Sequence, residues 1–264
     1  MPKPFSELFE FSFIPYYMDK IESLAETLVD KEEWDYGTPT IKKYPILKNY
    51  LEYTFRKIKR EDKIAYTEDK NYACFNTGLV TSNLEDIYAF FEKYKIKKGG
   101  RPPKQPYVLK AFLKKSSNIL VQHFASNYPD VANFFESPEF LIYNPKCELI
   151  PDIDHIIEDN LDRFPPHLKT ADSATVRRHL SGAIEEMKKR VRSNYKLAVP
   201  QYHMGRYQLL LPLSLTSGSQ NPDLALVIHK VNSNTYTSRT CLTLKMAYSN
   251  ARLIVKPESN WLKP

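Results

Sequence analysis

His155 and Asp159 are one helical turn apart, a spacing at which two side chains can share a chemical task. They lie in a stretch whose apolar residues have helical spacing from about residue 152 to residue 163. A histidine and a carboxylate on one helix face could hold a divalent metal, or serve as a general base and its partner. Residues 148–162 contain six acids and no Lys or Arg, so a solvated acidic helix face is the alternative. His155 and Asp159 are therefore candidate catalytic residues, with or without a divalent metal.

The segment Asn76-Thr77-Gly78 gathers small polar groups between two expected elements. It follows a strand expected over 71–75 and precedes a helix expected over about 82–91. Backbone N–H groups at a helix start, with an Asn amide and a Thr hydroxyl, could bind a phosphate or carboxylate. The alternative is a turn in which Gly78 has a positive φ and Asn76 bonds its own backbone. All three are candidate ligand-binding residues.

A basic stretch with interspersed aromatic side chains runs from residue 93 to residue 115. It contains nine Lys or Arg and no acid, together with Tyr94, Tyr107 and Phe112. Basic groups attract a phosphate backbone and aromatic rings stack on bases, so the combination is typical of nucleic-acid binding. An exposed lysine loop without a partner has the same composition. The candidate nucleic-acid-binding residues are Lys97, Lys98, Arg101 and Lys104.

Two glutamines near the C-terminus face each other if Met204-Gly205 forms a two-residue hairpin turn. Gln201 and Gln208 then share one sheet face, where their amides could read a base edge or bond one another. Arg252 lies in an apolar block, which favours either an anion ligand or a buried salt bridge. Further candidate ligand-binding residues are Arg163, Lys196 and Asn250.

The helix expected over about 175–195 carries a basic run at 188–192. Glu185 and Glu186 each have a basic residue four positions later, which is the spacing of ion pairs along a helix. A surface helix with salt bridges and a phosphate-facing helix both explain this pattern.

Composition excludes several classes of site. The chain has 264 residues, 38 Lys or Arg against 31 Asp or Glu, a net charge of +7 and only 7 Gly. Neither common glycine-rich phosphate loop occurs, and no zinc-protease, nucleophile-elbow or protein-kinase motif is present. The three widely spaced cysteines cannot form a disulfide framework, and no apolar run approaches the ~20 residues that span a bilayer. We therefore expect a soluble, cytoplasmic protein with reduced thiols and no membrane partner.

The elements that position these residues follow one another as helices, then a mixed region, then antiparallel strands. Helical spacing covers about 21–29 and 46–58, and alternation over 207–215 predicts a half-buried strand. This order predicts an α+β fold with N-terminal helices, a mixed middle region and a C-terminal antiparallel sheet with packed helices.

We expect one domain over residues 1–264, with a helical part to about residue 60 and a mixed α/β part from about residue 61. The remaining expected elements are strands at 63–66, 107–113, 119–124, 140–143, 224–231 and 236–244, and a short helix near 130–135.

Four blocks of the sequence resemble one family. They are PILKNYLEYTF (45–55), CFNTGL (74–79), DHIIEDNLDRFP (154–165) and a C-terminal series that includes LTLKMAYSNARLI (242–254). In order and spacing they are similar to bacterial domain-of-unknown-function family 3825, whose hallmark is a Phe-Asn-Thr-Gly-Leu block. The resemblance covers nearly the whole chain. It implies no reaction, since no activity is established for the family, and Lys245 stands where members have an acidic residue.

Three functions are compatible with these residues. The first is binding of RNA or of a nucleotide-like anion, and the second is a phosphoesterase or other nucleotide-processing enzyme that uses His155 and nearby acids. The third is a structural protein-interaction domain. An enzyme requires His155 and an acid to converge with the Asn76 turn in one cleft. A nucleic-acid-binding module requires only a continuous positive surface.

Overall fold

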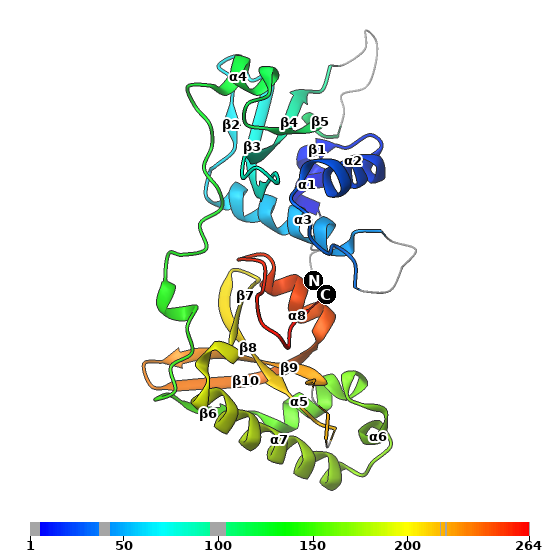
Figure 1. The fold of residues 1–264 in the computed structure, drawn as a ribbon, viewed down its shortest axis with the longest axis vertical. Coiled ribbons are helices and arrows are strands. Elements are labelled where there is room, and N and C mark those ends of the chain that lie inside the picture. Colours follow the sequence, from blue (N-terminus) through cyan, green and yellow to red (C-terminus); the bar gives the residue numbers. More distant parts are fainter. Residues whose placement is uncertain (1–5, 37–42, 96–103, 217, 220, 264) are drawn as a thin grey trace. The chain divides into compact units, whose positions relative to one another are not determined.

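The computed structural model describes residues 6–36, 43–95, 104–216, 218–219 and 221–263. Its helices and strands make an α+β protein, as the sequence predicts. The chain divides into an N-terminal unit, Met1–Asn133, and a C-terminal unit, Phe134–Pro264. Each unit contains a five-stranded sheet and is described by itself (Figure 1). None of the helices in the described part of the chain is long and apolar enough to cross a membrane.

The N-terminal unit is built on a sheet with the strand order β1-β5-β4-β3-β2. Neighbours from β2 to β5 are antiparallel, whereas β1 is parallel to β5. The strands are β1 (Ser12–Phe13), β2 (Ala65–Tyr66), β3 (Tyr72–Val80), β4 (Asp86–Lys93) and β5 (Tyr107–Lys114). The helical elements are α1 (Ser6–Phe11), α2 (Tyr17–Ser23), the π-helical turn η1 (Leu24–Leu28), α3 (Pro45–Arg60) and α4 (Asn118–Phe124).

Helix α3 covers one face of this sheet. It begins at Pro45, a residue type favoured in the first helical turn, and it is amphipathic along its length. Phe55 and Ile58 of α3 share one core with Phe75 of β3 and Phe91 of β4. The N-terminal unit therefore joins the expected first helices and the strands that follow them in a single core.

Helix α4 covers part of the opposite face. Ser117 precedes it as N-cap, and its hydroxyl accepts the Leu120 N–H. Leu120 and Phe124 pack there with Tyr88 and Phe90 of β4. The end of the face nearer β1 does not belong to this core, and it includes the exposed side chain of Phe13.

The C-terminal unit contains a sheet with the order β6-β10-β9-β8-β7. The strands are β6 (Glu148–Pro151), β7 (Val199–His203), β8 (Arg206–Leu213), β9 (Leu224–Asn232) and β10 (Thr235–Thr243). The α-helices are α5 (Ile153–Asn160), α6 (Pro166–Lys169), α7 (Ser173–Ser193) and α8 (Leu244–Ala251). Three 3-10 turns are η2 (Pro138–Phe140), η3 (Leu161–Arg163) and η4 (Tyr195–Leu197).

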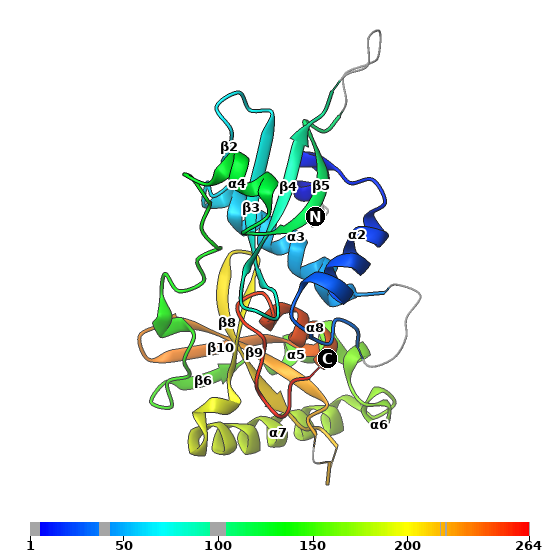
Figure 2. The ribbon, with the colours of Figure 1, turned by 45° about the horizontal axis from the view of Figure 1, so that its top comes forward.

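This second sheet is also covered on both faces. Alternate residues of β8, among them Leu211, pack with Ile156 of α5 and Leu180 of α7 on one side. α8 leaves the end of β10 and lies on the other side of the sheet from α7 (Figure 2). The strand expected over 207–215 is β8, and Leu209, Leu211 and Leu213 belong to the α7-facing core as the alternation predicts. Leu210 on the other face is buried as well, so the strand is not half-buried as expected.

The two units repeat one topology. In each unit, the first strand pairs in parallel with the last, helices follow the first strand, and the remaining strands form an antiparallel meander. Each meander is followed by a helix, α4 in one unit and α8 in the other. The boundary of the units at residue 133 therefore separates two similar structures, and it does not coincide with the expected change near residue 60. The expectation of a single domain stays a prediction.

Several expected elements are wrong. The helix expected over 82–91 is strand β4, and the strand expected over 119–124 is helix α4. Both segments are short and apolar on two sides, so residue spacing does not distinguish helix from strand there. The helix expected near 130–135 and the strand expected near 140–143 are irregular segments apart from η2. Strand β6, which the sequence analysis omits, pairs with β10.

Candidate functional site

The Asn76-Thr77-Gly78 segment forms an irregularity inside strand β3, at a shift of its register against β4. Gly78 has φ 72°, and its N–H donates to Oδ1 of Asn76 at 2.9 Å. The hydroxyl of Thr77 donates to the Ile87 carbonyl at 2.7 Å and accepts the Leu79 N–H at 3.2 Å. The polar groups of this segment are therefore used to hold the chain in its own irregular path.

The phosphate-binding hypothesis for this segment loses its structural basis. It required a helix start, and β4 follows instead. The side chains of Asn76 and Thr77 are buried, and the Tyr50 hydroxyl donates to the Thr77 carbonyl at 2.9 Å. The turn with a positive φ at Gly78, which was the alternative explanation, is the conformation observed. A ligand-binding role for the three residues stays a prediction.

Gln201 and Gln208 are opposite each other on β7 and β8, as the sequence predicts from a turn at Met204-Gly205. The Gln201 amide nitrogen donates to Oε1 of Gln208 at 2.9 Å, and its oxygen accepts the Asn250 amide at 3.1 Å. Gln201 is buried, whereas Gln208 and Asn250 are half-buried. The two bonds link the three amides in a row, which fixes α8 to β7 and β8 and gives these side chains a structural role.

Arg163 also takes part in an internal polar network. Its guanidinium donates to Oδ1 of Asn160 and to the Cys241 carbonyl, both at 2.6 Å. The buried Asn160 amide donates to the Ile156 carbonyl at 3.0 Å, and its oxygen also accepts the Thr240 hydroxyl at 2.8 Å. The network joins the end of α5 to β10, which is a structural task for Arg163.

The two remaining basic candidates of the C-terminal unit differ in exposure. Arg252 is buried and interacts with other groups of the protein. Lys196 lies exposed in η4. Arg163 lies in η3, Lys196 in η4 and Arg252 at the end of α8, so the three candidates come from three separate elements.

His155 and Asp159 form the pair that their spacing predicts, with Nε2 of His155 3.2 Å from Oδ2 of Asp159. Asp152 is the N-cap of α5 and accepts the His155 N–H. Within the described ranges, no group of three or more His, Cys, Asp or Glu side chains could hold a metal ion. His155 belongs to the C-terminal unit and Asn76 to the N-terminal unit. A catalytic role for the pair stays a prediction.

Of the four basic residues proposed to contact nucleic acid, Lys97, Lys98 and Arg101 lie outside the described residues. Lys104 is described and exposed. The basic stretch is anchored on β4 and β5, which form the centre of the sheet in the N-terminal unit. Other residues of that stretch therefore project from the sheet itself.

One row of residues crosses the end of this sheet that the α4 core leaves uncovered within the described residues. Phe13 pairs with Val108, Val108 with Glu92, and Glu92 with Tyr72. Paired residues on neighbouring strands point to the same face, and this face is the one that α4 covers at its other end. We call the uncovered region the open sheet face; it comprises Phe13, Tyr72, Glu92, Tyr94, Lys95, Val108 and Lys110.

Lysines surround the single carboxylate of the open sheet face. Nζ of Lys95 lies 2.7 Å from Glu92, and Nζ of Lys110 lies 3.1 Å from it. Hydrogen bonds from these two ammonium groups hold the pKa of the Glu92 carboxyl below its usual value. Lys20 donates to the Lys110 carbonyl at 2.6 Å, and its pKa is lowered by burial and by the charge of Lys110. Because two ammonium groups lie beside one carboxylate, this part of the open sheet face keeps a net positive charge.

Aromatic rings lie beside these charges. The rings of Phe13 and Tyr94 are 6.5 Å apart, and 48% and 37% of these residues are exposed. The ring of Tyr72 stacks with that of Phe90, with 5.5 Å between the ring centroids, and packs against the ring of His123 of α4, with 4.2 Å between the centroids. Lone exposed aromatic residues are ordinary, but an exposed pair next to unburied ammonium groups is a surface that can bind flat, anionic molecules.

The place of Phe13 on this face cannot be predicted from the sequence. Tyr94 lies within the basic stretch at residues 93–115, but Phe13 is 81 positions away from Tyr94. Phe13 joins the face because the two residues of β1 pair with β5, and a strand of two residues has no periodicity to detect. The alternation of charged and aromatic residues after Glu92 was the available signal.

Comparison with protein families confirms the resemblance in the sequence. Residues 25–261 match the family model described as Domain of unknown function (DUF3825). Comparison with curated proteins and with solved structures finds no match. Because the match spans nearly the whole chain, this protein belongs to the DUF3825 family.

Proposed function

We propose that the protein binds single-stranded RNA and that the open sheet face of the N-terminal unit is the binding surface. The observation that carries the proposal is the exposed pair Phe13 and Tyr94 beside Lys95 and Lys110. Proteins that bind single strands combine aromatic side chains, on which bases stack, with basic groups that follow the phosphates.

Base stacking and lysine–phosphate contacts of typical strength are sufficient for such binding. Stacking of one base on an aromatic side chain contributes about 1–3 kcal/mol, so Phe13 and Tyr94 together could contribute several kcal/mol. The side chains of Lys95 and Lys110 are 80% and 51% exposed, and their ion pairs with Glu92 are accordingly weak. A phosphate can therefore replace Glu92 as the partner of either lysine at a small cost.

The distribution of charge favours RNA over a protein partner on this surface. An apolar protein interface would require depletion of charge at its centre, whereas the aromatic pair here lies among lysines.

We place this function in the cytoplasm, where thiols stay reduced, because Cys74, Cys147 and Cys241 are buried and free.

The test is a fluorescence-anisotropy titration of the full chain with a labelled oligouridine of about 12 nucleotides, at about 50 mM salt. Replacing both Phe13 and Tyr94 by Ala should weaken binding at least about tenfold, through loss of stacking. Tyr195→Ala is the matched control, because Tyr195 is an exposed aromatic residue of the other unit. Absence of binding by the unaltered chain, or equal binding by the double variant, would show that the proposal is wrong.

Single-stranded DNA of the same length is a second arm of the titration. Stacking and phosphate contacts do not by themselves distinguish the two nucleic acids, whereas contacts to the 2′-hydroxyl do. Tighter binding of RNA supports the proposal as stated. A clear preference for DNA would contradict the RNA part of it.

A further inference from the structure

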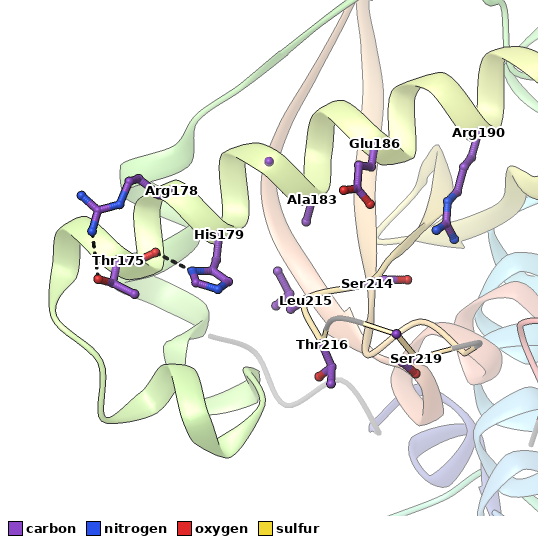
Figure 3. Close-up of a pocket in the computed structure, with 12 residues that line it drawn as sticks. Thr175, Arg178, His179, Ala183, Glu186, Arg190, Ser214, Leu215, Thr216 and Ser219 are labelled. Atoms are coloured by element: carbon purple, nitrogen blue, oxygen red, sulfur yellow. Dashed lines mark hydrogen bonds between the residues drawn. The ribbon is translucent and has the colours of Figure 1, made fainter.

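The C-terminal unit contains a cavity of about 510 Å³, open to solvent, between helix α7 and the loop that follows β8 (Figure 3). Ligand sites for small molecules commonly have volumes of about 300–1,000 Å³. The cavity is lined from the helix by Thr175, Arg178, His179, Glu186 and Arg190, and from the loop by Ser214, Thr216 and Ser219. It belongs to one unit and involves none of the residues of the open sheet face.

The helix side of the cavity is one stripe of α7. His179, Glu186 and Arg190 follow one another at intervals of seven and four residues, which places them on one face. Gly182 lies between them, and nothing in the described part of the chain stands within 4 Å of the position where its Cβ would be. Glycine inside a helix costs about 0.5–1 kcal/mol relative to alanine, and no packing contact explains it here. Its effect is to leave space in the middle of the stripe.

One carboxylate fixes the beginning of the loop side. Asp223 accepts the N–H of Leu215 at 2.6 Å and both the N–H and the hydroxyl of Thr216, at 2.8 and 2.9 Å. The Ser219 hydroxyl donates to the Asn221 carbonyl at 2.7 Å, and Gly218 has φ 77°. The bonds from Asp223 fix Leu215 and Thr216, two lining residues, opposite the helix.

The lining groups are suited to a phosphate. In Figure 3, the side chains of Glu186 and Arg190 extend from α7 toward the loop that carries Ser214 and Ser219. The ion pair expected between Glu186 and Arg190 does not form within the described residues, so the Arg190 guanidinium keeps its donors for another acceptor. Arginine in this state binds phosphate oxygens through paired N–H groups.

The end of the cavity near the start of α7 supplies further hydrogen-bond donors. The Arg178 guanidinium donates to the Thr175 hydroxyl at 3.1 Å. Nδ1 of His179 lies 3.0 Å from the Thr175 carbonyl, and because a carbonyl only accepts, Nδ1 carries the hydrogen and Nε2 can contact a ligand. Arg178 and Arg190 are ~18 Å apart along the helix axis at 1.5 Å per residue, which is longer than one phosphate group.

We infer that this cavity is a binding site for a phosphate monoester of nucleotide size, with Arg190 as the main phosphate ligand. A monoester carries about −1.5 to −2 charge near neutral pH, which the Arg190 guanidinium complements at one end of the cavity, while Arg178 lies at the other end. A free mononucleotide and the terminal phosphate of an RNA strand both present this chemistry.

Calorimetric titration of the full chain with uridine monophosphate and with uridine tests the inference. We expect the nucleotide to bind and uridine not to bind, since the phosphate is the recognised group. Arg190→Gln should weaken binding at least about tenfold by removing a charged donor. Gly182→Met should do the same by placing a side chain in the middle of the cavity, whereas Lys189→Gln, an exposed neighbour outside the lining, should leave binding unchanged.

RNA with and without a 5′-phosphate distinguishes the two sources of the ligand. Binding that requires the 5′-phosphate and Arg190 identifies the RNA end, and binding of the mononucleotide alone identifies a free nucleotide; either supports the site. Failure of every phosphate-bearing probe, or equal losses in Arg190→Gln and Lys189→Gln, would overturn it. The outcome is independent of the open sheet face, because variants of Phe13 and Tyr94 should bind the nucleotide normally.

Discussion

The hydroxyl oxygen of Tyr50 lies 2.7 Å from the point where a Cβ atom on Gly78 would stand. The same hydroxyl donates to the Thr77 carbonyl at 2.9 Å, so the tyrosine closes over the irregular part of β3. Gly78 is therefore required twice, for its φ of 72° and for the space that its missing side chain leaves. This relationship accounts for the Asn-Thr-Gly segment as a folding feature.

We predict that Gly78→Ala lowers the free energy of unfolding by about 1–3 kcal/mol, through the strained φ and the contact with Tyr50. Urea denaturation measures the change. In a Tyr50→Phe background the loss should be smaller, because the clashing oxygen is gone. Gly182→Ala is the matched control and should leave stability unchanged or raise it by up to about 1 kcal/mol, since that position is helical and open. Equal losses at both glycines would contradict the account of Gly78.

Asn160 should be among the polar residues on which the stability of the C-terminal unit depends. Asn160→Ala removes one of the two acceptors of the Arg163 guanidinium and the acceptor of the Thr240 hydroxyl, and we expect a loss of about 1–3 kcal/mol in the free energy of unfolding. Glu158→Ala, an exposed position on the same helix, should change it by less than about 0.5 kcal/mol. Similar effects of the two substitutions would show that the buried network contributes little.

Stability should fall as pH rises through the neutral range because of Glu52. Burial raises the pKa of this carboxyl to about 7, although Arg56 and Lys48 act in the opposite direction. Its pKa in the unfolded chain is about 4.3, so between these values the folded state holds the extra proton, and the stabilisation is lost as pH rises.

Glu52→Gln removes this titration. The variant should therefore become more stable relative to the unaltered chain between about pH 5 and pH 8, by an amount on the order of 1–3 kcal/mol. Urea denaturation at several pH values measures the difference. A difference that does not depend on pH would contradict the raised pKa.

Salt dependence tests the charged half of the open sheet face. Lys110→Gln should weaken RNA binding and reduce the slope of log affinity against log salt by about 0.7, the value for one phosphate contact on a single strand. Lys59→Gln is the matched control, because Lys59 is similarly exposed but lies on α3, at the opposite face of the sheet. The same change in slope for both variants would indicate a diffuse charge effect without a defined surface.

Sequence reasoning predicts the strongly amphipathic elements of this protein. The buried stripe of α7 includes Val176, Leu180, Ile184, Met187 and Val191, as its spacing indicates, and the Gln201–Gln208 pairing follows from a two-residue turn. Both depend on contacts between residues near in the chain. Local patterns of this kind are sufficient to determine them.

The failure at β4 has a physical cause. Phe91 packs under α3 while Phe90 packs under α4, so both faces of the strand are apolar and its alternation disappears. Glu85, which suggests a helix cap, instead accepts the backbone N–H of Ser116, and Leu84 lies in a turn with φ 62°. The repeated topology of the two units is likewise invisible in the sequence, because it is a property of strand order.

The most direct test of RNA binding is ultraviolet cross-linking of the full chain to oligouridine, followed by mass spectrometry of the modified peptides. Bases stacked on the open sheet face should give adducts on the peptides that contain Phe13 and Tyr94, and excess unlabelled RNA should suppress them. Adducts confined to the C-terminal unit would contradict the proposed surface. So would an adduct level on these peptides that is no higher than the level found with excess unlabelled RNA.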